Sequence, residues 1–306
     1  MSYFLFILIN NIVPISVLIA IGFAVYRAFR IDIKTLSKLN FYVFSPVLVF
    51  VKLYESEMTM DTLGQVLLFF VIFYALLCLT VEAVIRYRKY KGGMRSAMRN
   101  SVIFYNSANY AIPLNQTVFA GNPHTLSIQI IIMLFQSLIP NTFGVYSVNA
   151  HKVHWKDSLK IVFMMPAIYA IPIAVLMHTF HVPIPASLNI PLQYIANAFM
   201  ATALITLGVQ LGALNWGFRF SDVLISNFLR LLIGPVLGLL VVSMLGIGGM
   251  TAKALILSCA VPTSLISVLL AVEYDNEVDF SSQAVFFSTV CSIITVPLTI
   301  YFIQFY

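Results

Sequence analysis

The chain has 306 residues, of which 60% are hydrophobic and only 9% are charged, and its mean hydropathy is +0.95. Roughly a quarter of the residues of a soluble domain are charged, so this composition excludes a soluble globular protein and indicates a chain surrounded by lipid. The net charge of +6 could suggest nucleic-acid binding, but the basic residues gather in short loops between apolar segments, as membrane topology signals do.

Apolar segments follow one another along the whole chain, and each is about as long as the twenty residues that a helix needs to cross the hydrocarbon core. They predict ten transmembrane helices, near residues 4–26, 34–53, 62–85, 97–120, 126–148, 159–180, 190–213, 222–246, 251–272 and 280–304. An even number of helices places both termini on the same side of the membrane.

The basic residues predict the orientation. Most of them lie in the loops after the first, third and fifth predicted helices: Arg27, Arg30, Lys34 and Lys38; Arg86, Arg88, Lys89, Lys91, Arg95 and Arg99; Lys152, Lys156 and Lys160. Basic loops remain in the cytoplasm, so we expect both termini to be extracytoplasmic. We expect a multi-pass protein of the plasma membrane.

Five helices in each half give the halves opposite orientations, as in an inverted repeat. The first repeat is predicted at residues 1–150 and the second at residues 151–306. When the fourth predicted helix is laid on the ninth, Ile112 matches Ile266 and Ser127 matches Ser281, a weak internal similarity.

Polar residues and proline interrupt the fourth and ninth predicted helices, in FYNSANYAIP (Phe104–Pro113) and VPTS (Val261–Ser264). Proline removes a backbone hydrogen bond, and irregular backbone at membrane depth persists only where protein or a wet cavity covers it. We therefore predict breaks at Tyr110–Pro113 and Val261–Thr263. Paired breaks of this kind indicate the central site of a transporter, where half-helix N-termini offer free N–H groups to anions and freed carbonyls can bind cations.

The predicted substrate site lies at these breaks. Its residues are Asn106, Ser107, Asn109, Pro113, Pro262, Thr263 and Ser264. The polar side chains would line the site, and the prolines would hold the unwound segments open. The alternative is a pair of ordinary proline kinks whose asparagines bond neighbouring helices; the matched pair of breaks favours the site.

Two ionisable residues fall within predicted spans, Glu82 in the third and Arg230 in the eighth. Ionisable residues at membrane depth are functional candidates and usually have a partner. They are candidates for a charge pair or a gate. A purely structural pair, or side chains that extend to the membrane surface, are equally compatible with the sequence.

Several segments resemble the auxin efflux carrier family, and they lie in the same order along essentially the whole chain. They are LNFYVFSPVLVF (Leu39–Phe50), FYNSANYAIPL (Phe104–Leu114), LITLGVQLG (Leu204–Gly212), LRLLIGP (Leu229–Pro235) and the stretch Cys259–Ile300. The resemblance implies an all-α membrane protein with ten helices in two inverted five-helix repeats, similar to bile-acid symporters and sodium/proton antiporters. In that fold, helices 1, 2, 6 and 7 form a scaffold that often dimerises. Helices 3–5 and 8–10 form an elevator-type core with crossed, broken helices 4 and 9.

The resemblance also implies a function. Plant members of the family move auxin, a carboxylate, and their crossover asparagines and prolines surround its carboxylate group; Asn106, Asn109, Pro113 and Pro262 match or lie beside those positions. It therefore implies a secondary transporter that moves small organic anions, in particular carboxylates, by alternating access as a homodimer among membrane lipids. The long cytoplasmic loop of many plant members is absent, which favours a compact prokaryotic-type member.

Two other functional classes remain open from the sequence. A transport-fold sensor would bind a metabolite or sterol without net flux, but such receptors usually carry signalling domains. A membrane hydrolase needs a nucleophile with a base in reach, and the deepest histidine in a span is His178, near an edge.

The sequence predicts no metal, cofactor or nucleic-acid partner. Coupling of transport to Na⁺ or H⁺ is a separate question. The fourth and ninth predicted helices contain no carboxylate, so strict proton coupling through them is not expected. Sodium coupling through carbonyl and amide groups stays open.

Overall fold

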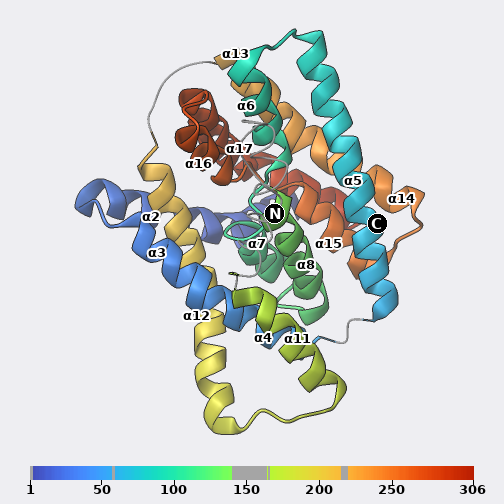
Figure 1. The fold of residues 1–306 in the computed structure, drawn as a ribbon. Helices are drawn as coiled ribbons and strands as arrows, with labels where there is room; N and C mark the ends of the chain where they lie inside the picture. The colour runs from blue at the N-terminus through green and yellow to red at the C-terminus, as the bar shows by residue number, and fades with distance from the viewer. Residues whose placement is uncertain (1–2, 57–58, 140–163, 165, 215–219) are drawn as a thin grey trace.

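The computed structural model describes residues 3–56, 59–139, 164, 166–214 and 220–306. These residues form helices with one isolated β-bridge and no strand among them (Figure 1). The elements are α1 Tyr3–Ile7, η1 Leu8–Ile12, α2 Val13–Phe29, α3 Ile33–Leu39, η2 Asn40–Phe44, α4 Ser45–Tyr54, α5 Met60–Tyr87, α6 Gly92–Ile103, α7 Ala111–Val118, α8 Pro123–Ile139, α11 Pro166–Thr179, α12 Ala186–Gly212, α13 Phe220–Phe228, η4 Leu229–Ile233, α14 Gly234–Met244, α15 Gly249–Cys259, α16 Ile266–Glu273 and α17 Val278–Ile303.

Six helical stretches in the described part of the chain are long and apolar enough to cross a membrane, which makes this a multi-pass, all-α membrane protein. They are Phe4–Phe29, Ile33–Tyr54, Asp61–Tyr87, Ala186–Gly212, Ser221–Met244 and Val278–Ile303. Each coincides with one of the ten predicted spans.

The other four predicted spans are broken or only partly described. Two of them are each divided into a pair of short helices, α6 with α7 and α15 with α16. Parts of the fifth and sixth predicted spans lie outside the described residues, as do Lys152, Lys156 and Lys160 and the predicted boundary between the repeats. The ten-helix count and the inverted repeat therefore stay predictions.

Three long helices contain a π-helical turn, and a proline follows each turn at the second residue. The turns are η1, η2 and η4, and the prolines are Pro14, Pro46 and Pro235. A proline ring clashes with the carbonyl group four residues earlier and cannot donate to it. A widened turn accommodates both effects, and π turns occur often at functional sites. Two of these turns carry a buried polar or charged residue, Asn40 in η2 and Arg230 in η4.

Glycines bring α2 and α12 into close contact. A Cβ atom at Gly208 of α12 would overlap the carbonyl oxygen of Ile19 and lie 2.8 Å from the backbone nitrogen of Phe23. A Cβ atom at Gly22 of α2 would likewise overlap the carbonyl oxygen of Ile205. Small residues at a helix crossing allow two backbones to touch, which is the main source of packing attraction inside lipid.

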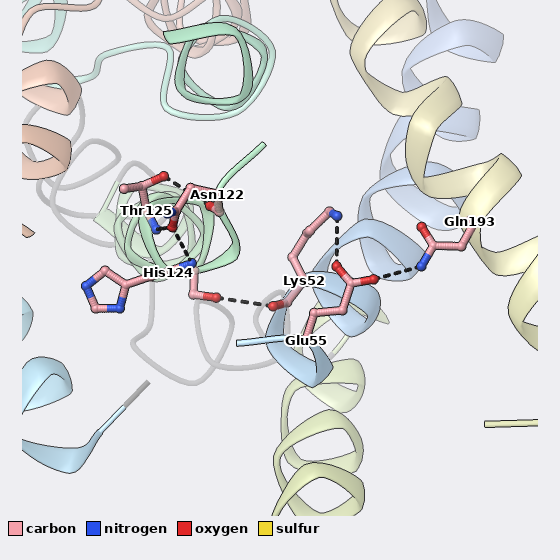
Figure 2. A network of polar contacts seen from close by, with 7 residues as sticks. Lys52, Glu55, Asn122, His124, Thr125 and Gln193 are labelled. Carbon is pink, nitrogen blue, oxygen red and sulfur yellow. Dashed lines mark hydrogen bonds and ion pairs between the residues drawn. The ribbon is translucent and has the colours of Figure 1, made fainter. Parts of the chain in front are cut away.

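Polar contacts join α4 to α12 and to α8 (Figure 2). Glu55 pairs with Lys52 at 2.9 Å and accepts a hydrogen bond of 2.8 Å from Gln193 of α12. The hydroxyl group of Ser127 in α8 donates to the carbonyl oxygen of Lys52 at 3.3 Å. Asn122 caps α8, because its side-chain oxygen accepts from the backbone N–H groups of the second and third residues that follow it.

Candidate substrate site at two paired helix breaks

Both predicted helix interruptions are present, but the first lies earlier in the chain than predicted. Helix α6 ends at Ile103 and α7 begins at Ala111, so the break occupies residues 104–110. The prediction of a break at Tyr110–Pro113 was therefore wrong in position. Pro113 is the third residue of α7, in the first turn, where helical N–H groups have no intrahelical partner and proline costs little. The second break, at residues 260–265, includes the predicted Val261–Thr263.

The two breaks pair with each other through their backbones. The N–H group of Asn106 donates to the carbonyl oxygen of Pro262 at 2.8 Å, and the N–H group of Ser264 donates to that of Phe104 at 2.8 Å. These bonds form an isolated antiparallel bridge between Tyr105 and Thr263. The pairing satisfies backbone groups that would otherwise be exposed at membrane depth, where each unpaired group costs several kcal/mol, roughly 2–7.

Side chains from other elements bind the carbonyl groups at the end of α6. The donors are Thr263 Oγ1 to Ser101 at 2.8 Å, Arg230 Nη1 to Val102 at 3.2 Å and Gln136 Nε2 to Ile103 at 3.3 Å. The last carbonyls of a helix lack intrahelical partners, so these bonds complete the end of the half-helix. The break is thus a supported structure and not a frayed segment.

A cavity of about 490 Å³ lies between the paired breaks and the helices α3, α4, α8, α11 and α12. Its described lining is Ser37, Lys38, Asn40, Phe41, Tyr42, Ser45, Asn106, Ala108, Asn109, Met133, Leu134, Ser137, Pro166, Ala167, Phe199, Gln210, Ser264, Leu265, Ile266 and Leu269. A smaller cavity of about 150 Å³ adjoins the first break and shares several of these residues. The larger volume falls within the range of ligand sites, roughly 300–1,000 Å³.

Three of the seven predicted site residues line the larger cavity: Asn106, Asn109 and Ser264. Within the described residues, neither asparagine side chain forms a hydrogen bond with the protein, so both amides remain available to a ligand. This arrangement differs from the kink interpretation, in which the asparagines would bond neighbouring helices. Ser107 lines only the smaller cavity, where its carbonyl oxygen accepts a hydrogen bond of 2.9 Å from Gln129.

The other three predicted residues support the break and do not line either cavity. The hydroxyl group of Thr263 is directed at α6 by its bond to Ser101, and its N–H group donates to Ser288 Oγ at 3.1 Å. The carbonyl group of Pro262 holds Asn106. Pro113 is buried within α7.

The expectation of free N–H groups at the half-helix N-termini was wrong for the first residues of α7. The N–H groups of Ala111 and Ile112 already donate to the carbonyl oxygens of Asn106 and Ala108, at 3.0 and 3.3 Å. In α16 the N–H group of Ser267 donates to the carbonyl oxygen of Ser264 at 3.2 Å. Residues of the breaks thus bind these N–H groups, which are not free to bind an anion.

The sequence did not predict the residues that line the cavity away from the breaks. They include polar residues from α3, η2 and α12, among them Lys38, Asn40 and Gln210. Asp32 caps α3 through the backbone N–H groups of Lys34 and Thr35, and hydrogen bonds from the Thr35 hydroxyl and these N–H groups lower the pKa of Asp32. This cap fixes where α3 begins and hence which of its residues face the cavity. The only sequence signal was a lysine and an asparagine near the start of an apolar span.

Glu82 and Arg230 do not pair with each other. Glu82 of α5 bonds to Arg95 and to Arg99, the latter at 2.7 Å, and lies 3.8 Å from Arg86. Arg230 is fully buried and donates to backbone carbonyls of α6 and α15. The predicted charge pair is therefore not formed. Glu82 belongs to a cluster of arginines at the basic loop, and Arg230 lies apart from it at the helix breaks.

Comparison with known proteins identifies the class. Residues 148–300, half of the chain, match the family described as "Membrane transport protein". An "Uncharacterized transporter" of Methanothermobacter thermautotrophicus is 23% identical over 272 residues, which cover 87% of this chain and 88% of that protein. The chain therefore belongs to this family, the auxin efflux carrier family that its segments resemble, and it is a membrane transporter.

Proposed function

We propose that this protein is a secondary carrier that moves small organic anions, most simply carboxylates, across the plasma membrane by alternating access. The observation that carries the proposal is the composition of the cavity. The described lining contains one cation, Lys38, and several neutral donors, but no carboxylate. Apolar residues such as Phe199 and Leu269 complete it. This set of groups matches a ligand with an anionic end and an organic body.

The position of Lys38 supports recruitment of the anion. Lys38 is exposed and lies in the last turn of α3, near the predicted cytoplasmic end of its span, whereas Asn106 and Asn109 lie at the breaks. An exposed cation attracts the anion by long-range electrostatics without holding it in a desolvated pocket. The neutral amides then bind the carboxylate and release it readily. The cavity thus provides a route from the cytoplasmic end to the breaks.

The proposal is tested by flux into proteoliposomes with acetate, malonate, succinate and indole-3-acetate as probes. We expect at least one of them to show protein-dependent, saturable flux. Lys38→Met is expected to lower the apparent affinity of that probe, and more strongly at low than at high ionic strength, since an exposed cation acts through long-range electrostatics that salt screens. Lys34→Met is the matched control, because Lys34 is on the same helix but is not among the cavity-lining residues. Binding without any flux would contradict the carrier and favour the sensor.

The orientation is proposed from the basic loops, with both termini outside. The residues Arg86, Arg88, Arg95 and Arg99 gather with Glu82 and Asp222 at one end of the described structure. In a variant without native cysteines, single cysteines placed before residue 3 and after Tyr306 should react with an impermeant maleimide in intact cells. A cysteine at Lys91 should not react. Labelling at Lys91 from outside would reverse the orientation.

We further propose a homodimer formed through α2, α4, α11 and α12.

A further inference from the structure

Arg230 is a buried cation with no carboxylate partner among the described residues. Its side chain has no exposed surface, and it lies in the π turn η4 between α13 and α14. Every ion pair found in the described part of the chain involves other residues. A lone buried charge is costly unless polar groups replace its water, so the surroundings of this guanidinium group must carry compensating negative charge.

Two half-helix ends supply that charge. Arg230 Nη1 donates to the carbonyl oxygen of Val102, in the last turn of α6, and Nη2 donates to that of Cys259, the last residue of α15. The C-terminus of a helix carries roughly −0.5 of an elementary charge. Two such ends therefore present about one negative charge, which matches the single positive charge of the guanidinium group.

Two further features adapt the site to a guanidinium group. The ring of Tyr105, in the first break, lies 4.6 Å from the guanidinium carbon, a cation–π distance. Gly234 leaves room for it, because a Cβ atom there would lie 2.8 Å from Arg230 Nη2 and 2.9 Å from the carbonyl oxygen of Cys259. The site is thus closed by the ring of Tyr105 from the break and by the backbone of α14 at Gly234.

We infer that Arg230 is a built-in cation that occupies the place of a coupling ion between the C-terminal ends of α6 and α15. In carriers with discontinuous helices, unwound carbonyls and half-helix C-terminal ends coordinate Na⁺. Here the corresponding carbonyls bind the protein's own guanidinium group. Removal of the side chain should therefore create a vacant cation site. If the protein is the carrier proposed above, sodium does not bind between these two helix ends during its cycle.

The test measures thermal stability and needs no substrate. Arg230→Ala is expected to lower the melting temperature of the purified protein by about 10 °C, as for a broken buried charge interaction. Guanidinium or Na⁺ at millimolar concentration should restore part of that loss, whereas equimolar urea, which is similar in shape to guanidinium but neutral, should not. Arg86→Ala is the control, since its side chain is 80% exposed and its melting temperature should respond to neither cation.

A second set of variants keeps the test decisive if Arg230→Ala does not fold. Arg230→Lys retains the charge, while Arg230→Gln retains polar bulk without it. We expect Arg230→Lys to melt clearly above Arg230→Gln. Equal melting temperatures for these two variants, or an Arg230→Ala protein that no cation stabilises, would show that the side chain only packs and hydrogen-bonds. Neither result depends on transport, so failure of this inference is distinguishable from failure of the proposed carrier function.

Discussion

Replacement of Gly208 by leucine is expected to abolish the recovery of folded protein. A Cβ atom at this position already overlaps the carbonyl oxygen of Ile19 in α2, and the obstacle is backbone that cannot rotate away. The larger side chain would separate α2 from α12 and remove their contact. Gly208→Ala is expected to fold with a loss of about 1–3 kcal/mol, the usual cost of overpacking. Size-exclusion chromatography and melting temperature in detergent measure both effects.

Gly64→Ala provides the control for this prediction. Gly64 is also a helical glycine, in α5, but nothing lies within 4 Å of the place where its Cβ atom would be. Alanine should be tolerated there, and the higher helix propensity of alanine should raise stability slightly, by up to about 1 kcal/mol. Normal yield and melting temperature for Gly208→Leu would contradict the close approach of α2 and α12.

The same glycines show what the sequence can and cannot predict. The spacing of Gly208 and Gly212 is visible in the sequence and typical of helices in close contact in membranes. The partner is not visible, because a second copy of the chain and another helix of the same chain would require the same pattern. In the structure the partner is α2: a Cβ atom at Gly212 would lie 3.1 Å from the ring of Tyr26.

The breaks illustrate the same limit on a smaller scale. The lengths of the apolar segments predicted the six spans that the structure describes, because the thickness of the hydrocarbon core dictates how long a spanning helix must be. Proline predicted that a helix would be interrupted but placed the first interruption too late. The break begins at Phe104, whose carbonyl group accepts from the N–H group of Ser264, and this contact joins residues far apart in the chain. The sequence shows that Arg230 and Lys38 lie in or near apolar spans. Only the packing of distant helices places Arg230 at the helix ends and Lys38 at the cavity.

Asn106→Ala and Asn109→Ala are each expected to weaken the binding of the transported carboxylate by one to two orders of magnitude. Both side chains line the cavity, and neither bonds to the described protein, so their amide groups are free to donate to an anion. The loss of a hydrogen bond to a charged group costs roughly 1.5–3 kcal/mol, and each 1.4 kcal/mol is about tenfold in affinity. The melting temperature without substrate should hardly change. Calorimetric titration with the probe that shows the highest flux measures the affinity.

Asn115→Ala is the matched control, on the half-helix α7 that follows the break. Asn115 is buried outside the cavity, where it donates to the carbonyl oxygen of Thr125 at 3.2 Å and accepts from its hydroxyl group at 2.9 Å. Its loss removes two buried hydrogen bonds to Thr125, each of which contributes about 0.5–1.5 kcal/mol. We therefore expect a lower melting temperature and an unchanged affinity, the opposite of the two cavity variants. If Asn106→Ala and Asn109→Ala behaved like Asn115→Ala, the paired breaks would be a packing structure and the carboxylate would have to bind elsewhere.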